Sequence, residues 1–153
     1  MIRKIEDAHE KKNISTHILL DLPEWFSLPE STESYIRDSQ AMPFWCYEDH
    51  HTPLGFIALK ETSPDTCEIF VMGVLKKHHQ QGIGASLIRV YEEYAREKGY
   101  SYSQVKTVQM GHYDTYDGTN RFYYAMGYRE LECFPDMWDE WNPCSIYVKR
   151  IKF

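Results

Sequence analysis

The sequence has no hydrophobic run long enough to cross a membrane. A membrane-spanning helix needs about 20 consecutive apolar residues, and no such run occurs in the 153 residues. The N-terminal segment 1–12 lacks the apolar core of a secretory signal peptide. Pro-, Gly- or Ser-rich linkers, low-complexity segments and internal repeats are also absent. We therefore expect a single domain over residues 1–153, cytoplasmic and without a membrane partner.

The spacing of the cysteines also matches neither a metal-binding motif nor a redox motif. The four cysteines form no C-x-x-C motif: Cys46, Cys67, Cys133 and Cys144. Two histidine pairs, at 50–51 and 78–79, have no further His or carboxylate at i, i+4 spacing on a common helix. Reduced, mostly buried thiols and solvated histidine turns explain these residues best, and we expect no metal.

An excess of positive charge is missing as well. The chain has 17 Lys and Arg against 23 Asp and Glu, which gives a formal net charge of −6. Binding to nucleic acid requires a basic face, so this balance argues against a nucleic-acid partner. An acidic surface instead favours cationic or amine-bearing partners.

What is present is a strand, a tight glycine loop and a helix, in that order. Residues Thr66–Val74 are rich in β-branched and aromatic types that suit a buried strand, and residues 75–81 (LKKHHQQ) break that pattern. Gly82-Ile83-Gly84 then opens an amphipathic helix that Gly99 stops. Its apolar face comprises Leu87, Ile88, Tyr91, Tyr94 and Ala95.

Such a glycine loop at a helix start favours anion binding. Glycines let a ligand approach the backbone, and the first N–H groups of the helix point outward at the positive end of its dipole. A pyrophosphate would fit there. The motif is not a nucleotide-binding P-loop, because no Lys-Ser or Lys-Thr follows, and Leu87 replaces the third glycine of a dinucleotide fingerprint.

The loop resembles the acyl-coenzyme A loop of the GNAT superfamily of N-acetyltransferases. In that family a strand ending in Val precedes [RQ]-x-x-G-x-[GA]; here Val74 ends the strand and residues 79–84 (HQQGIG) match, except that His79 replaces Arg or Gln. A second block, residues 122–128 (FYYAMGY), resembles the family segment F-Y-x-x-x-G-[FY]. The two blocks occur in the family order.

The remaining patterns predict the other elements of a domain of this kind. We expect strands over 1–5, 44–47, 54–60, 102–108, 128–134 and 145–151, and helices over 13–22, 28–39 and 119–126. A polar turn at 48–53 would join an antiparallel hairpin, whereas 110–118 and 135–143 read as loops. The fold class is then α/β (α+β), with a mixed, mostly antiparallel sheet of about seven strands and about four helices.

The resemblance implies a binding site for acetyl-CoA as co-substrate. In the family the strands corresponding to Thr66–Val74 and 102–108 splay apart, and the pantetheine arm lies between them. Main-chain groups of Met72 and Val74 would then contact the pantetheine and the acetyl carbonyl. The pyrophosphate would lie on the loop residues His79, Gln80, Gln81, Gly82, Ile83, Gly84 and Ala85.

The resemblance also implies two catalytic residues. Tyr123 matches the family tyrosine that donates a proton to the coenzyme thiolate, and Glu68 resembles the strand glutamate that acts as base in some members. A packed helix aromatic and a solvent-facing strand residue are the alternative interpretations. An alkyl amine, with a pKa near 10, must lose a proton before it can attack the thioester.

Acceptor contacts are expected at two places. Family members place the helices after the first strand on the acceptor side, which makes Glu24, Trp25 and Phe26 candidates; Trp138, among carboxylates, suits a cation. Packing over the core edge is the alternative for these aromatics. We expect an N-acetyltransferase for a primary amine of a small-molecule or peptidic acceptor, with homodimerisation possible. A non-catalytic acyl-CoA sensor and an interaction module remain the rival interpretations.

Overall fold

The computed structural model describes residues 1–152 and contains one seven-stranded sheet in the order β1-β2-β3-β4-β5-β7-β6. Only β4 and β5 pair in parallel. The strands are β1 (Ile2–Lys4), β2 (Phe44–Asp49), β3 (Thr52–Ser63), β4 (Thr66–Val74), β5 (Tyr102–Val108), β6 (Arg129–Asp139) and β7 (Asn142–Arg150). The helices are α1 (Ala8–Leu19), α2 (Pro29–Ser39), α3 (Ile83–Glu97) and α4 (Asp114–Ala125), with the 3₁₀ turn η1 at Lys76–His78. The expected fold class is confirmed.

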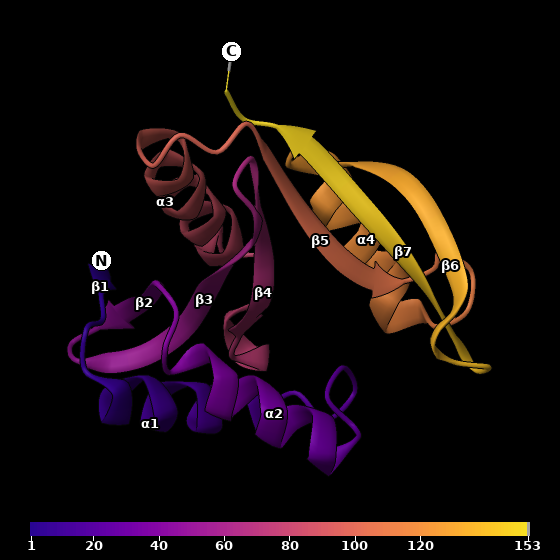
Figure 1. The fold of residues 1–153 in the computed structure, drawn as a ribbon. Helices are drawn as coiled ribbons and strands as arrows, with labels where there is room; N and C mark the ends of the chain where they lie inside the picture. Colours follow the sequence, from indigo (N-terminus) through magenta and orange to yellow (C-terminus); the bar gives the residue numbers. More distant parts are fainter. Residues whose placement is uncertain (153) are drawn as a thin grey trace.

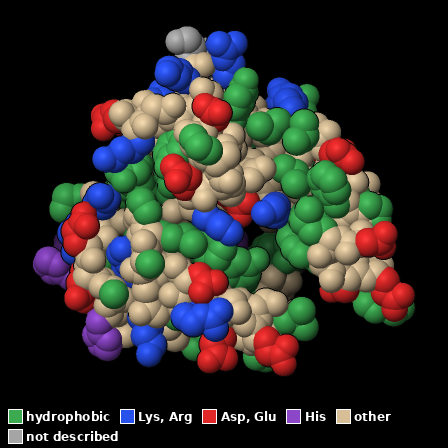
Figure 2. All heavy atoms as spheres, in the orientation of Figure 1, with side chains coloured by type: hydrophobic (Ala, Val, Ile, Leu, Met, Phe, Trp, Pro, Cys, Tyr) green, Lys and Arg blue, Asp and Glu red, His purple; other side chains and the backbone are tan. Residues whose placement is uncertain are grey.

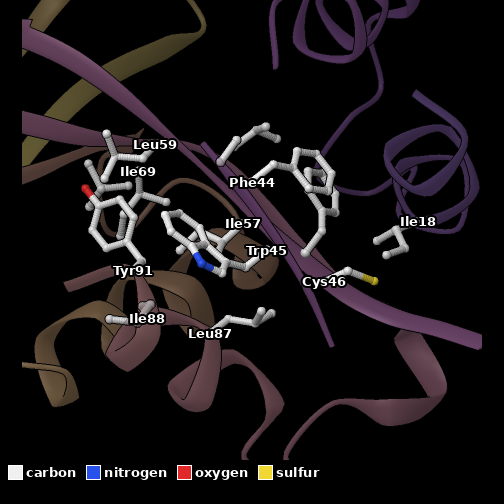
Figure 3. Packing of buried hydrophobic residues seen from close by; sticks show 14 of the residues in the cluster. Ile18, Phe44, Trp45, Cys46, Ile57, Leu59, Ile69, Leu87, Ile88 and Tyr91 are labelled. Carbon is white, nitrogen blue, oxygen red and sulfur yellow. The ribbon is translucent and has the colours of Figure 1, made fainter. Parts of the chain in front are cut away.

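The core lies on both faces of the β2–β4 part of the sheet (Figure 3). On one face Leu87, Ile88 and Tyr91 of α3 pack near Trp45 of β2. On the other face α1 approaches closely because β4 has a glycine there. A Cβ on Gly73 would lie 3.1 Å from Ile18 Cγ2 and 3.0 Å from a methyl of Leu22, so a larger residue would push α1 away.

The parallel pair β4–β5 is joined at one end only. Its register comprises three residue pairs, Thr66 with Tyr102, Cys67 with Ser103 and Glu68 with Gln104. Beyond them the strands diverge, and Figure 1 shows the gap widening toward the C-terminal end of β4. We call the paired end of these strands the closed end and the separated end the open end. Strand β5 instead pairs with the antiparallel strand β7, along the whole length of β5.

A buried hydrogen-bond network stabilises the closed end. Ser103 Oγ lies 2.8 Å from the Tyr91 hydroxyl and 2.9 Å from the Tyr128 hydroxyl. The Tyr128 hydroxyl donates to Glu92 Oε2 (2.9 Å), and Lys149 Nζ donates to Glu92 Oε1 (2.9 Å). These five side chains join α3, β5, the start of β6 and β7. Because each buried group has a partner, the network holds both sheet halves together where the strands meet.

Two helices begin earlier than the sequence pattern predicted. Helix α1 starts at Ala8 rather than near residue 13, because the Asp7 carboxylate caps it by accepting from the Glu10 amide (2.8 Å). Helix α4 starts at Asp114 rather than near residue 119. The predicted loop 110–118 is thus wrong in its second half: Gly118 lies inside a helix, although glycine lowers helix propensity.

The two hairpin turns are shorter than predicted. The β2–β3 turn narrows to His50 and His51, both with positive φ (48° and 68°), the conformation of a two-residue hairpin turn. The predicted loop 135–143 is wrong, since β6 runs to Asp139 and β7 begins at Asn142. Pro135 is tolerated because β6 is an edge strand. Within residues 1–152 no helix is long and apolar enough to cross a membrane.

Candidate active site

The first turn of α3 presents main-chain amides without helical partners. The first helical hydrogen bond runs from Ser86 N to Gly82 O (3.0 Å), which leaves the amides of Ile83, Gly84 and Ala85 without an intrahelical acceptor. No side chain caps this end, and the first turn carries no acidic residue. Together with the helix dipole, these amides make the start of α3 electropositive, at the place where the glycine motif predicts anion binding.

Glycine occurs at positions 82 and 84 of the loop for different physical reasons. Gly82 has a φ of +81°, a backbone conformation that favours glycine. A Cβ there would meet no atom within 4 Å, so the residue borders open space. Gly84 lies inside the helix, where a Cβ would come within 3.1 Å of the Phe122 ring. Its small size lets α4 pack against the start of α3.

The open end of β4 presents main-chain groups toward the gap. Leu75 N donates to Leu54 O (2.8 Å), and pairing continues antiparallel through Val74 with Gly55 and Met72 with Ile57. Hydrogen-bonded pairs alternate along such a ladder, so the N–H and C=O groups of Met72 and Val74 point away from β3. They face the side where β5 has separated, and their contact with a donor stays a prediction.

A β-bulge sets which side chains of β4 share a face. Ala58 pairs with Val71 and Leu59 with Ile69, so Phe70 is the extra residue. Cys67 contacts the α3 residue Tyr91 (Sγ to hydroxyl oxygen, 3.2 Å), and beyond the bulge Gly73 faces α1. Alternation up to the bulge therefore places Glu68 on the face covered by α1 and α2.

His79 turns toward β4. One ring nitrogen, Nε2, lies 2.7 Å from the Val74 carbonyl oxygen, so the imidazole donates a hydrogen bond to that oxygen. The ring also packs edge-on against Trp25, with centroids 5.6 Å apart. His79 is thus in contact with the end of β4, while Gln80 (φ 61°) and Gln81 continue the loop toward Gly82.

Tyr123 lies on α4 and is buried, with 6% of its surface exposed. Burial raises the pKa of its phenol above the usual value near 10, and the nearby Tyr116 and Tyr35 add to this rise. The phenol therefore stays protonated at neutral pH, as a proton donor requires. Asn120 fixes this part of the helix, because its Nδ2 donates to the Val108 carbonyl at the end of β5 (2.9 Å).

Glu68 is buried and ion-paired. Its Oε1 accepts from Lys106 Nζ of β5 (2.9 Å) and from Gln104 Nε2 (3.3 Å). It lies in the last residue pair before β4 and β5 diverge, at the floor of the gap. The Lys106 contact was not predicted from the sequence; alternation along β5 could have placed Lys106 beside Gln104, but the cross-strand partner depends on the parallel register.

An aromatic row lies on the same face as Glu68. Phe26 packs edge-on against Tyr35 of α2 (centroids 5.8 Å apart), and Tyr35 packs against Phe70 of β4 (5.3 Å). Burial raises the pKa of Tyr35, as do the charges of Glu68 and Cys144. Tyr35 thus packs against the strand that borders the gap, and no sequence motif predicted this position. Figure 2 shows the molecule hollowed in this region, with hydrophobic walls and Lys or Arg side chains at the upper rim.

The remaining predicted acceptor residues lie at separate places. Glu24 is paired with Lys76 Nζ (2.6 Å), which lowers the pKa of its carboxyl. The indole of Trp25 is half-buried, and its Nε1 donates to Thr119 Oγ1 (3.0 Å). Trp138 is 42% exposed near the end of edge strand β6. The four residues before it, 134–137, line a shallow depression. The structure thus brings Trp25 and Phe26 to the open end and leaves Trp138 on the hairpin.

Comparison with known proteins agrees with this geometry. Residues 11–128 match the model of the acetyltransferase (GNAT) family. N-acetyltransferase 8B of Rattus norvegicus is 28% identical over 116 residues, which cover 72% of this chain and 50% of that protein. The chain thus spans about half the length of this curated relative.

Solved structures share the fold across nearly the whole chain. An aminoglycoside 6'-N-acetyltransferase complexed with coenzyme A superposes with a TM-score of 0.78 at 17% identity, covering 99% of this chain and 97% of that one. The aminoglycoside 6'-N-acetyltransferase from Enterococcus faecium gives 0.79 at 16% identity, with 99% and 97% covered. A family member from Elizabethkingia anophelis with acetyl-CoA bound gives 0.68 at 17% identity, with 84% and 87% covered. With the family model spanning most of its length, from α1 through the glycine loop to the start of β6, this chain belongs to the acetyltransferase (GNAT) family.

Proposed function

We propose that the protein is an N-acetyltransferase that moves an acetyl group from acetyl-CoA to a primary amine. One observation carries the proposal: the unpartnered amides of Ile83–Ala85 lie next to the outward main-chain groups of Met72 and Val74. A Cβ on Gly84 would come within 3.7 Å of the Met72 side chain. A thioester donor with a diphosphate and an amide-containing arm needs both kinds of group. The solved structures of this fold that contain coenzyme A or acetyl-CoA support the proposal.

The donor would be held by backbone. The diphosphate lies on the amides of Ile83, Gly84 and Ala85, where Gly82 leaves open space. The pantetheine amides pair with the N–H and C=O of Met72 and the N–H of Val74, as an added strand would. The Val74 carbonyl is engaged by His79, so His79 shapes the end of this edge more than it contacts phosphate.

The chain's own residues then serve a direct transfer. The amine nitrogen attacks the acyl carbon, the carbon–sulfur bond breaks, and the sulfur takes a proton from the Tyr123 hydroxyl. Glu68 accepts the amine proton through its second oxygen, Oε2, or through water, because Lys106 and Gln104 bind Oε1. Most of the rate enhancement comes from holding both reactants in the gap.

The acceptor is proposed to be a cationic small molecule or peptide. The aromatic row Phe26–Tyr35–Phe70 and the carboxylate of Glu68 line the α2 side of the gap, which suits an amine carried on an apolar or cationic body. The net charge of −6 attracts such a molecule. Two of the superposed enzymes act on aminoglycosides, which are polycationic amines, and this supports the same class.

The proposal is tested by substituting Gly82 with a negatively charged residue. Because Gly82 has φ +81° and borders open space, Asp and Asn both fit, and they share any backbone strain. We expect Gly82→Asp to weaken coenzyme A binding about 100-fold through repulsion of the diphosphate, whereas Gly82→Asn retains most of the affinity. Isothermal titration calorimetry with coenzyme A measures both, and thiol release with a panel of amines measures turnover.

Three outcomes would overturn the proposal. Wild-type protein that gives no binding heat with coenzyme A is not a thioester-dependent enzyme. Equal affinities of the Asp and Asn variants would place the diphosphate away from the first turn of α3. Binding without thiol release for any amine in the panel would favour the non-catalytic sensor.

A further inference from the structure

The loop between α1 and α2 contacts two segments that border the open end. We call these segments the rims: η1 with the glycine loop is one, and the first turns of α4 are the other. We call residues 21–25 of the loop between α1 and α2 the strap. At one rim Asp21 Oδ2 accepts from the Lys76 amide (2.7 Å), and Glu24 Oε2 accepts from Lys76 Nζ (2.6 Å). Both contacts are to η1, which leads into the glycine loop. The strap is thereby attached to the segment that positions the amides of α3.

At the other rim the strap is attached to α4. Trp25 Nε1 donates to Thr119 Oγ1 (3.0 Å) and to the Thr115 carbonyl (3.3 Å). In return the Tyr116 hydroxyl donates to the Trp25 carbonyl (2.6 Å). Burial raises the pKa of Tyr116 to about 12, so this hydroxyl remains a donor throughout the neutral range. Three contacts over a sequence separation of 90 to 94 residues thus join the strap to the first turns of α4.

The Trp25 side chain connects the two rims. It packs edge-on against His79, whose imidazole donates to the Val74 carbonyl at the end of β4. One residue therefore contacts the glycine-loop rim through its ring and the α4 rim through its indole N–H and its carbonyl. Its indole N–H is already engaged, so it has no donor left for an acceptor substrate.

We propose that Trp25 is a positioning residue that sets the width of the gap between β4 and α4. It acts through His79 on the end of β4 and through Thr119 on the helix that carries Tyr123. This inference rests on the proposed function and replaces the predicted acceptor contact of Trp25 with a role in binding the donor. Figure 1 shows the strap-bearing loop below the gap, where backbone pairing between β4 and β5 has ended.

The physical consequence is preorganisation. Without the strap, the rims would fluctuate in the free protein and would have to be ordered when the donor binds, which weakens affinity. Tyr123 would also be less well placed, although its own side chain is untouched. The expected signature is a weaker coenzyme A affinity together with faster hydrogen exchange at the start of α4 in the free protein.

The test uses two variants at the contact between the strap and α4, which we call the strap variants. Trp25→Phe keeps an aromatic ring near His79 but removes the indole donor, and Thr119→Val removes the acceptor while keeping the side-chain shape. Thr119 Oγ1 itself donates to the Thr115 carbonyl four residues earlier (3.1 Å). The control for the second variant is therefore Thr16→Val, because Thr16 makes the same helical contact with Lys12 O (2.6 Å). Trp141→Phe, at a 71% exposed indole, controls for the first.

We expect each strap variant to raise the dissociation constant for coenzyme A about fivefold to tenfold, as the loss of one hydrogen bond does. The double variant should be no weaker than Trp25→Phe alone, because Trp25→Phe already removes the contact that Thr119→Val removes. Hydrogen exchange at residues 114–119 should accelerate in both, and neither control should show these changes.

Unchanged affinity and exchange in Trp25→Phe would overturn the inference, as would additive effects in the double variant. This failure is distinguishable from failure of the proposed function. Wild-type protein that does not bind coenzyme A removes the proposed function, whereas wild-type binding with insensitive strap variants removes only the positioning role. The exchange measurement needs no ligand, so it tests the connection between the rims in either case.

Discussion

The closed and open ends of the β4–β5 pair are held together by different kinds of contact. At the closed end, three residue pairs of backbone register and a buried network of Ser103, Tyr91, Tyr128 and Glu92 connect the sheet halves. At the open end the backbones separate, and the connection passes through the side chains of the strap. The polar groups of the closed end bind one another. At the open end, main-chain N–H and C=O groups stay available to a ligand.

Along this one pair of strands, we expect the contacts of the closed end to determine stability and those of the open end to determine binding. Contacts at the closed end lie in the core, so we expect their loss to lower the free energy of unfolding without changing affinity for coenzyme A. The contacts of the strap at the open end involve half-buried or exposed groups. We expect their loss to change affinity or turnover with a small effect on stability.

The largest expected effect follows from Glu92→Gln at the closed end. Glu92 is 3% exposed and binds Lys149 and Tyr128, so the substitution leaves a largely buried ammonium without its counterion. We expect unfolding to become easier by roughly 3 kcal/mol, which lowers the melting temperature by about 10 °C. Differential scanning calorimetry measures this change, and isothermal titration should show unaltered affinity for coenzyme A.

The matched control is Glu93→Gln on the exposed side of the same helix, which should keep the wild-type melting temperature. A stable Glu92→Gln protein would mean that the network does not hold the closed end. Weakened coenzyme A binding at a temperature where the variant is folded would show that the two ends are coupled, contrary to the separation described above.

Next in size is Tyr123→Phe at the open end. If Tyr123 protonates the departing thiolate, kcat should fall by about 100-fold, which is the usual contribution of a positioned acid. The ring stays in place, so the dissociation constant for coenzyme A and the melting temperature should change little. Steady-state kinetics of thiol release with the best amine from the panel measures the effect.

Tyr124→Phe is the control, because Tyr124 is the 58% exposed neighbour on the same helix. It should keep the wild-type kcat. Full activity of Tyr123→Phe would assign the buried tyrosine to packing of α4, the interpretation that the sequence left open beside catalysis.

Patterns within one element were predictable from the sequence. The strand Thr66–Val74 and the helix beginning at Ile83 were predicted correctly, because a β-rich run, glycine punctuation and a single apolar face all indicated the same boundaries. The unpartnered amides follow from that junction alone. Positions of Met72 and Val74 on the outward edge were expected from the family resemblance, and the alternation of the β3–β4 ladder agrees.

What the sequence did not reveal depends on contacts between distant segments. Helix α4 was predicted five residues late because Gly118 favours a loop, yet Trp25 bonds Thr115 and Thr119 in that stretch. The Glu68–Lys106 pair depends on the register of parallel strands that no local pattern specifies. Both lie at the gap, where tertiary contacts override local preference.

The smallest expected effect concerns the closed end at high pH. Burial, followed by the carboxylate of Glu92, raises the pKa of Tyr128 above that of an unfolded tyrosine near 10. Above pH 10 the unfolded chain therefore binds fewer protons than the folded protein, and stability falls as pH rises toward the folded pKa, with a slope of up to about 1.4 kcal/mol per pH unit from this group. Tyr128→Phe should have a shallower decline above pH 10 in urea unfolding, while its curve runs parallel to wild type between pH 7 and about 9. Equal slopes above pH 10 would mean that Tyr128 exchanges its proton freely with solvent, so the network at the closed end would be open to water.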